Sequence, residues 1–258
     1  MTIYKFKNNN KMIKTTLKTV ILSVALTVCT FAMQAQVYKT VDVEANDWEG
    51  ETIGALYQAL TAEELQTVTH LTITGTINVK DFWAIRDYMH QIISIDISRV
   101  TIVGCLVYGM SYPANVVSHL SSLAALQSID LPESVTTIGG EAFSGCTALQ
   151  SINLPTSLIT IGDYAFADAG ITSIELPASP SKIGGGAFAG TGITAFSVDE
   201  ANVEYSAFDG ILYNKNKTSL KLYPPAKEGA EFIVPENGNS HWRLLFFGLF
   251  TTHFYKIA

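Results

Sequence analysis

The chain has 258 residues and 48% apolar content, enough for one large domain or two small ones with a sizeable buried core. Five of its 16 basic residues and none of its 23 acidic residues fall in residues 1–35, which leaves 11 basic against 23 acidic residues and a net charge of −12 on the rest. A chain this acidic has neither a basic stripe for nucleic acid nor a polybasic patch for a membrane surface.

The N-terminal segment has the pattern of a secretory signal. Lysines precede the apolar run "TVILSVALTVCTFA", which is too short and wrongly flanked to span a membrane. Small residues follow at candidate cleavage positions, Ala32 and Ala35. We therefore predict a signal peptide over residues 1–35 and an exported protein, secreted or at the cell surface, with no transmembrane span.

Two details of this segment leave alternatives open. Translation can begin at Met1 or at Met12, because a signal does not need the polar extension ahead of Met12. Cys29 is a candidate for lipid attachment, but Val28 stands where the residue before a lipidated cysteine should be small. Ordinary cleavage is the favoured interpretation.

Residues 36–122 contain two divergent units with a helix between them. Three apolar residues recur at an offset of 24 residues: Val68, Leu71 and Ile73 match Ile92, Ile95 and Ile97. The intervening "KDFWAIRDYM" predicts a short amphipathic helix. Upstream, Thr61 ahead of Glu64 predicts a capping box at the start of another helix.

Four copies of one pattern follow, with starts 23, 22 and 22 residues apart. They read "LQSIDLPESVTTIGGEAFSGCTA" from Leu126, "LQSINLPTSLITIGDYAFADAG" from Leu149, "ITSIELPASPSKIGGGAFAGTG" from Ile171 and the degenerate "ITAFSVDEANVEYSAFDG" from Ile193. The shared template is L-x-S-I-x-L-P, an apolar residue, then I-G-x-x-A-F. Such a fixed period is typical of stacked repeats, in which each unit buries its apolar edge against its neighbours.

The first half of each unit predicts a strand. In "LQSINLP", Ile152 and Leu154 point to one side of an extended segment while Ser151 and Asn153 point to the other. Pro155 ends the strand, because it has no N–H to donate to a neighbouring ladder.

The second half of each unit predicts a return to the interior. Leu158 and Ile161 are its apolar positions, and Gly162 permits a sharp corner between them and the next segment. "DYAFAD" is short enough for one helical turn or a tight bend, from which Phe166 fills the layer from the far side.

The cadence I-G-x-x-A-F-x-x-C-x-x-L-x-x-I-x-L-P over about residues 120–236 resembles that of the BspA-like leucine-rich repeats of bacterial surface and secreted proteins. The resemblance implies a β-rich (α+β), right-handed leucine-rich repeat solenoid of about 22–23 residues per repeat. Residues 36–122 would be its irregular N-terminal cap with divergent repeats, and residues 123–237 the solenoid. For function, the resemblance implies surface adhesion or binding to host matrix.

A β-hairpin is predicted within the solenoid, at residues 205–224. Two β-prone runs, residues 211–213 and 220–223, flank the polar "NKNK". The strand pattern restarts after it at "EFIVPE", and we expect the hairpin to project from the repeats.

Cys146 is predicted to be a small buried side chain rather than a nucleophile. Its place is taken by Asp168 or Ala169 in the next unit and by Thr191 or Gly192 in the one after, so it is interchangeable. A disulfide with Cys105 is the less favoured alternative.

Catalytic and metal-binding patterns do not occur in the sequence. The histidines, at positions 70, 90, 119, 241 and 253, form neither H-E-x-x-H nor a close pair. "IGGGAFAG" lacks the lysine of a phosphate-binding loop, and the repeat explains its glycines. We therefore expect no enzyme activity, no metal and no cofactor.

Residues 238–258 depart from the template. "LLFFGLF" is too short for a membrane span, and nothing in the segment resembles a unit. We favour an aberrant hydrophobic tail from a shifted frame or truncated gene. A genuine hydrophobic cap on the last repeat is the alternative, although terminal repeats normally have a polar outer face.

The candidate binding surface is the outward side of the predicted strands, called here the strand face. Alternation places polar side chains there in rows: Thr72, Ser94, Asp96, Ser128, Asp130, Ser151, Asn153, Ser173, Glu175 and Ser197. The competing interpretation is that these rows only solvate the sheet. Because the strand face has no aromatic residue, aromatic contacts would come from elsewhere. The candidates are Tyr213, Tyr223 and Tyr205 around the hairpin, and Tyr108 and Tyr112 in "GCLVYGMSYPANVV".

Together these patterns predict a monomeric, non-enzymatic binding protein whose partner is an extracellular protein or glycan. No cell-wall sorting module is recognisable, so the sequence does not choose between release and retention at the surface. The alternative is a truncated structural family member with no binding function of its own.

Overall fold

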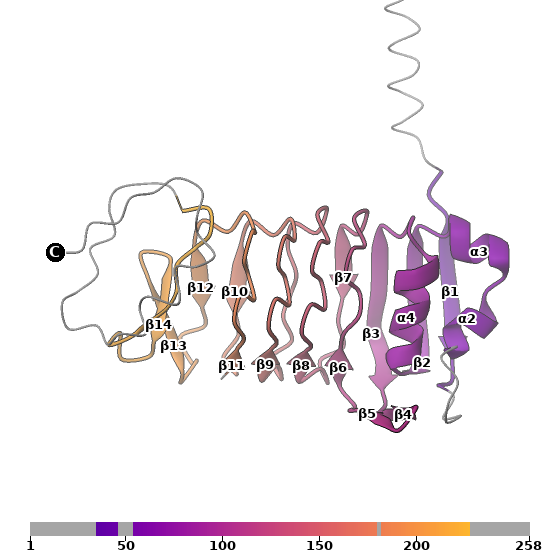
Figure 1. Cartoon of the computed structure of the whole chain (residues 1–258), viewed down its shortest axis with the longest axis horizontal. Helices are drawn as coiled ribbons and strands as arrows, with labels where there is room; N and C mark the ends of the chain where they lie inside the picture. Colours follow the sequence, from indigo (N-terminus) through magenta and orange to yellow (C-terminus); the bar gives the residue numbers. More distant parts are fainter. Residues whose placement is uncertain (1–34, 46–53, 180–181, 228–258) are drawn as a thin grey trace, which may run out of the picture. The chain divides into compact units, whose positions relative to one another are not determined.

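The computed structural model describes residues 35–45, 54–179 and 182–227, and its elements belong to one compact unit, Val37–Ala258 (Figure 1). The predicted signal peptide up to residue 34, "EFIVPE" and the predicted tail at 238–258 lie outside these residues. Within the described ranges, no helix combines the length and the apolar character that a membrane crossing needs.

Strands dominate the described residues, in agreement with the predicted β-rich class. The helices gather in the N-terminal part: α2 (Ala55–Ala59), α3 (Ala62–Thr67) and α4 (Val79–Tyr88). The capping box predicted at Thr61 and Glu64 is confirmed, since each side chain accepts a hydrogen bond from the other residue's backbone N–H. The helix predicted from "KDFWAIRDYM" is α4.

A buried carboxylate joins two of these helices. Asp81 Oδ1 accepts a 2.8 Å hydrogen bond from Leu56 N in α2, and Asp81 Oδ2 accepts a 2.9 Å bond from Asn78 N at the start of α4. Burial raises the pKa of Asp81 above its ordinary value. The contact fixes α2 against the first turn of α4.

The first sheet contains four parallel strands in the order β1 (Tyr38–Val43), β2 (His70–Ile77), β3 (Ser94–Ile102) and β7 (Ser128–Asp130). Its register places Leu71 beside Ile95 and Ile95 beside Ile129, so buried side chains stack from strand to strand. β2 and β3 are the strands of the two divergent units expected from the sequence. β1 was not predicted, because "YKTVDV" has no second copy in the sequence.

The strand ladder on this side is interrupted. β10 (Ile174–Leu176) and β12 (Phe196–Val198) pair with each other, and residues 150–154 form no strand. Their side chains still alternate, with Ile152 buried and Ser151 and Asn153 exposed. A single inter-repeat bond, Thr172 N to Gln150 O at 3.1 Å, remains. The strand prediction for this copy is therefore wrong in its pairing but right about which side chains the segment buries.

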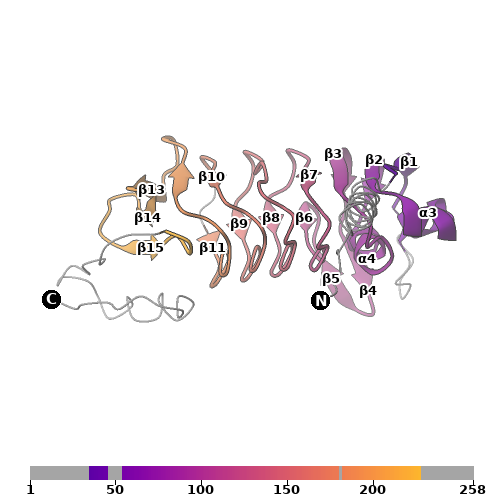
Figure 2. The ribbon, with the colours of Figure 1, turned by 90° about the horizontal axis from the view of Figure 1, so that it is seen from above.

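A second parallel sheet lines another side of the stack, which the sequence did not predict. Its order is β11 (Lys182–Ile183), β9 (Thr160–Ile161), β8 (Thr137–Ile138) and β6 (Val116–Val117). Figure 2 shows these strands as a row distinct from that of β7 and β10. The apolar position predicted to face the interior, Ile161, is fully buried there.

The A-F segment forms a tight bend rather than a helical turn. Alternate N–H groups donate to the next repeat, such as Phe143 N to Ala165 O at 2.7 Å and Phe166 N to Ala187 O at 2.8 Å. The phenylalanines of successive repeats stack, with Phe143 and Phe166 rings 5.4 Å apart and Phe166 and Phe188 rings 5.5 Å apart. Phe166 thus fills the layer from this side.

At the corner of the repeat, Gly162 lies too close to the neighbouring backbone for any side chain to fit. It is absent from the glycines with positive φ, but a Cβ there would lie 2.5 Å from Gly140 N and 2.7 Å from Gly139 C. The backbone of the preceding repeat occupies that space, so only glycine fits. The expected sharp corner therefore depends on the missing side chain and not on a left-handed backbone.

Serines in two of the "LPxS" motifs tie neighbouring repeats. Ser157 Oγ donates to Val135 O at 2.7 Å and also contacts Glu133 O. Ser179 Oγ, in the next repeat, donates to Leu158 O at 2.7 Å and contacts Thr156 O. These serines satisfy carbonyls that the turn after the proline leaves without an inter-strand partner.

Two antiparallel elements complete the described fold. β14 (Ile211–Asn214) pairs with β15 (Leu220–Leu222) and with β13 (Tyr205–Phe208), so the two runs flanking "NKNK" belong to a three-stranded sheet. β4 (Cys105–Val107) and β5 (Met110–Tyr112) form a hairpin ahead of the repeats. One apolar cluster extends from Val41 in β1 to Leu212 in β14, so the repeats share a core with the strands and helices before them.

Candidate functional site

The strand face lies at the surface, and part of it is held in register. β2, β3 and β7 align Thr72 with Asp96 and Asp96 with Asp130. A parallel row aligns Ser94 with Ser128, whose Oγ atoms are 2.9 Å apart and hydrogen-bonded. The outward residues of the later repeats are exposed: Ser151, Asn153, Ser173, Glu175 and Ser197.

The acidic members of the strand face differ in their bonding. Asp96 Oδ1 accepts hydrogen bonds from Ser98 N at 3.0 Å and Ser98 Oγ at 2.7 Å, which fix its carboxylate. Asp130 and Glu175 are exposed, and within the described part of the chain neither forms an ion pair. The structure therefore brings Asp96 and Asp130 together, whereas Glu175 belongs to the separate β10–β12 pair.

The candidate tyrosines around the hairpin are less accessible than expected. Tyr205 is 8% exposed and belongs to the core, which argues against a role as a surface contact. Tyr213 and Tyr223 are half-buried, and burial raises the pKa of the Tyr213 phenol. Tyr108, at the tip of the β4–β5 hairpin, is 68% exposed, while Tyr112 packs against Trp83.

Cys146 is a buried structural thiol. It is fully buried, its Sγ lies 3.2 Å from Leu120 O, and burial raises its pKa to about 11. Cys105 is also buried, and no disulfide joins it to Cys146. In the stacked bend the residues equivalent to Cys146 are Ala169 and Thr191, since each donates its N–H to the phenylalanine carbonyl three residues earlier.

The described histidines lie in three separate settings. His70 stacks on Tyr38 and contacts Thr69 Oγ1, His90 is exposed, and His119 packs against Trp83. Burial, with the nearby Arg86 charge, lowers the pKa of His119. No three His, Cys, Asp or Glu side chains of the described residues group as a metal site would require.

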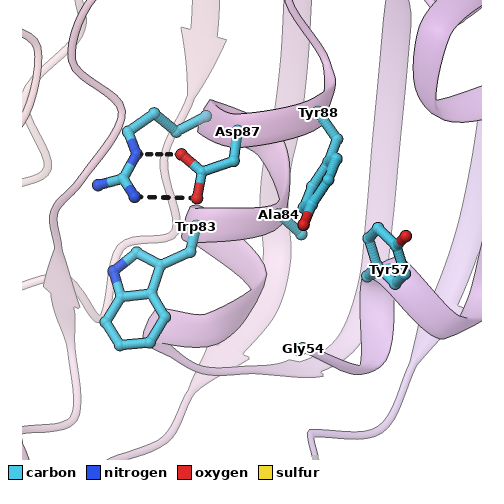
Figure 3. Close-up of a pocket in the computed structure, with 7 residues that line it drawn as sticks. Gly54, Tyr57, Trp83, Ala84, Asp87 and Tyr88 are labelled. Atoms are coloured by element: carbon cyan, nitrogen blue, oxygen red, sulfur yellow. Dashed lines mark hydrogen bonds and ion pairs between the residues drawn. The ribbon is translucent and has the colours of Figure 1, made fainter. Parts of the chain in front are cut away.

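A pocket that the sequence did not predict lies beside α4. It has a volume of about 310 Å³, and its lining comes from α2, the residue before it, and α4. Figure 3 shows the Trp83 indole on one side of Ala84, the Tyr88 and Tyr57 rings on the other, and Gly54 at the lower edge. The pocket thus lies in the cap, away from the strand face residues of the repeats.

Aromatic contacts hold the pocket walls. The Tyr57 and Tyr88 rings are 4.7 Å apart with an interplanar angle of 56°. Trp83 makes edge-on contacts with Tyr112 at 5.5 Å and with His119 at 5.7 Å. Part of the pocket could have been found from the sequence, since Trp83 shares one helix face with residues 86 and 87, but Tyr57 comes from a separate helix.

An ion pair forms the polar edge of the pocket. Arg86 Nε donates to Asp87 Oδ1 at 2.6 Å and Arg86 Nη2 donates to Asp87 Oδ2 at 3.0 Å (Figure 3). This bond to Asp87 raises the pKa of Arg86. The guanidinium and carboxylate therefore present a flat, neutral pair of hydrogen-bonding groups beside the aromatic walls.

Residues 119–222 match, in six copies, the model of the family described as BspA type leucine rich repeat region. This part of the chain is a BspA-type leucine-rich repeat region. The resemblance seen in the repeat cadence is thereby confirmed. No curated protein matches the chain.

Solved structures similar to the chain include bacterial leucine-rich repeat proteins. The pneumococcal vaccine antigen PcpA is 20% identical, with a TM-score of 0.47 over 80% of this chain and 51% of that one. A leucine rich cell surface protein from Faecalibacterium prausnitzii is 21% identical, with a TM-score of 0.40 over 67% and 50%. A leucine-rich repeat protein from Eubacterium ventriosum is 24% identical, with a TM-score of 0.48 over 64% and 48%. The chain spans about half the length of these proteins.

The strand face begins before the matched repeats, at Thr72, Ser94 and Asp96, and continues into them. Asp130, Asn153 and Glu175 lie inside the matched residues 119–222, as do the hairpin tyrosines Tyr213 and Tyr223. The pocket residues, from position 54 to 88, precede the match. The pocket therefore lies outside the residues that match the BspA-type repeats.

Proposed function

We propose that the chain is an exported binding protein, not an enzyme, and that its strand face recognises a basic surface on an extracellular protein or glycan. Leucine-rich repeat stacks offer a rigid array of side chains at fixed spacing, which lowers the entropic cost of binding. The acidic charge of the chain outside residues 1–35 favours a partner of opposite charge.

The alignment of Asp96 with Asp130 carries this proposal. Neighbouring strands of a sheet lie about 4.8 Å apart, so the register places two carboxylates in adjacent positions on β3 and β7. Like charges directly opposite each other destabilise a sheet. Polar uncharged residues would solvate the sheet without this repulsion. A cationic partner would offset the repulsion between the two carboxylates.

The test is a double charge reversal on the strand face. The purified chain is assayed by biolayer interferometry against a panel of matrix proteins and on a glycan array. Asp130→Lys with Glu175→Lys is expected to weaken capture by about tenfold or more, because it places cations against a basic partner. Circular dichroism checks that the variant remains folded.

A matched variant controls for net charge. Glu141→Lys with Asp168→Lys makes the same change at exposed acids on the A-F bends, which lie on another side of the stack. We expect this variant to keep its capture. Equal loss in both variants, or full capture by the strand-face variant, would contradict the proposed surface.

Export rests on the sequence pattern of residues 1–35 and has its own test. Expression in a bacterial host should yield a processed chain in the extracytoplasmic fraction. N-terminal sequencing should find the new terminus next to Ala32 or Ala35. An unprocessed chain confined to the cytoplasm would refute export without affecting the strand-face test.

A further inference from the structure

The pocket beside α4 has the size and lining of a site for one small ring-shaped ligand. Its volume of about 310 Å³ is at the lower end of the roughly 300–1,000 Å³ typical of ligand pockets. That volume is too small for a helix or a protein loop. The lining combines aromatic rings with few polar groups, as ligand pockets usually do.

The aromatic walls suit an apolar ring face. Trp83 is braced by Tyr112 and His119, and Tyr57 is braced by Tyr88, so the walls are fixed before any ligand arrives. Tyr88 is 42% exposed and therefore keeps ring surface available. The electron-rich face of an aromatic ring attracts C–H groups that carry a small positive charge.

The polar edge suits hydroxyl groups rather than an ion. Two of the five Arg86 N–H donors are used by Asp87, and the others remain to donate to a ligand oxygen. The Asp87 oxygens have further lone pairs that can accept from hydroxyls. Because the pair is internally neutralised, a ligand carboxylate would have to break it.

We propose that this pocket binds one neutral pyranose unit of a glycan, with the C–H face of the sugar against the aromatic walls and its hydroxyls on Arg86 and Asp87. A pyranose has both parts of this chemistry: an apolar face of axial C–H groups and a rim of hydroxyls. The site lies in the cap and does not rest on the proposed role of the strand face.

Saturation-transfer NMR with methyl β-D-glucopyranoside and methyl β-D-galactopyranoside tests the proposal. A dissociation constant on the order of 1 mM is expected from the number of non-hydrogen atoms in such a ligand. Transfer should be strongest to the C–H protons of one ring face. Methyl β-D-glucuronide, which adds a carboxylate to the same ring, should show weaker transfer.

Variants locate the binding in the pocket. Tyr88→Ala should reduce transfer by about fivefold or more, because it removes wall surface and the brace of Tyr57. Tyr88 is partly exposed, so this change is expected to leave the fold intact, which the melting temperature checks. Tyr164→Ala is the matched control, since Tyr164 is 53% exposed and lies in the repeats. Its transfer should equal that of the unchanged chain.

The outcomes that overturn the proposal are distinct from failure of the strand face. Absence of transfer from both neutral glycosides at about 20 mM would reject a pyranose site. Equal transfer with and without Tyr88 would place the sugar elsewhere, and stronger transfer to the glucuronide would reject a neutral ligand. The strand-face variant Asp130→Lys with Glu175→Lys should retain pocket binding, so the two proposals can fail separately.

Discussion

The glycines that follow the isoleucine of each repeat show how single residues set the distance between repeats. At Gly184, as at Gly162, a Cβ would meet the backbone of the preceding repeat, 2.4 Å from Asp163 N. Gly185, the next residue, has open space instead, since its nearest contact would be Asp163 Oδ1 at 3.9 Å. Close packing therefore requires glycine at position 184 but not at position 185.

Gly162→Ala should destabilise the chain by about 1–3 kcal/mol or more, because the added methyl group must displace backbone rather than a flexible side chain. Gly185→Ala is the matched control and should change stability by less than about 0.5 kcal/mol. Urea unfolding followed by circular dichroism measures both. Similar midpoints for the two variants would show that the corner relaxes at little cost.

The stacked bends illustrate how an element gains stability only from its neighbours. Phe166 lies between Phe143 and Phe188, with interplanar angles of 7° and 2°, and is fully buried. Phe196 ends the column in an edge-on contact with Phe188 at 63°. Phe166 and Phe188 therefore each pack against a ring of the repeat before and a ring of the repeat after.

Phe166→Ala should cost about 3–5 kcal/mol, because it leaves a cavity between two rings that cannot both move into it. Phe208→Ala provides the same substitution at a phenylalanine that is 62% exposed and contacts only Lys217 among the charged groups described. It should cost about 1 kcal/mol or less. The shift in urea midpoint of each variant distinguishes them, and equal shifts would rule out the column as a source of stability.

The elements that could be predicted are those whose signal repeats along the chain. The spacing of Leu126, Leu149 and Ile171 indicated the stack, and all three residues are fully buried. The second sheet was missed because its strands are only two residues long, such as Thr160–Ile161, and one buried residue beside a polar one does not distinguish a strand from a turn. The pocket was missed because its walls meet only in three dimensions.

At the scale of the whole molecule, one continuous core links repeats that each contact only their neighbours. Interior repeats are held on both sides: the repeat that contains Phe166 accepts a bond from Phe143 N at Ala165 O and donates one from Phe166 N to Ala187 O. Among the described residues, the three-stranded sheet of β13, β14 and β15 packs mainly against β12. Local opening should therefore be easier there than in the central repeats.

Hydrogen exchange followed by mass spectrometry should show this gradient. Amides of residues 138–166 are expected to exchange at least about tenfold more slowly than amides of residues 211–222, because opening a central repeat breaks two interfaces. Exchange at one uniform rate across both segments would indicate instead that the described unit unfolds as a single cooperative body.

Most inter-repeat bonds of the bends run in one direction, from the N–H of one repeat to the C=O of the next, as from Phe143 N to Ala165 O and from Phe166 N to Ala187 O. A block of 22 or 23 residues duplicated within the array would find acceptors on one flank and donors on the other, both already matched to it. Tandem copying can therefore lengthen such a protein without redesigning either neighbour. The one-residue difference between these units falls after the phenylalanine, whereas a residue lost ahead of the serine would shift the serine, glycine and phenylalanine together.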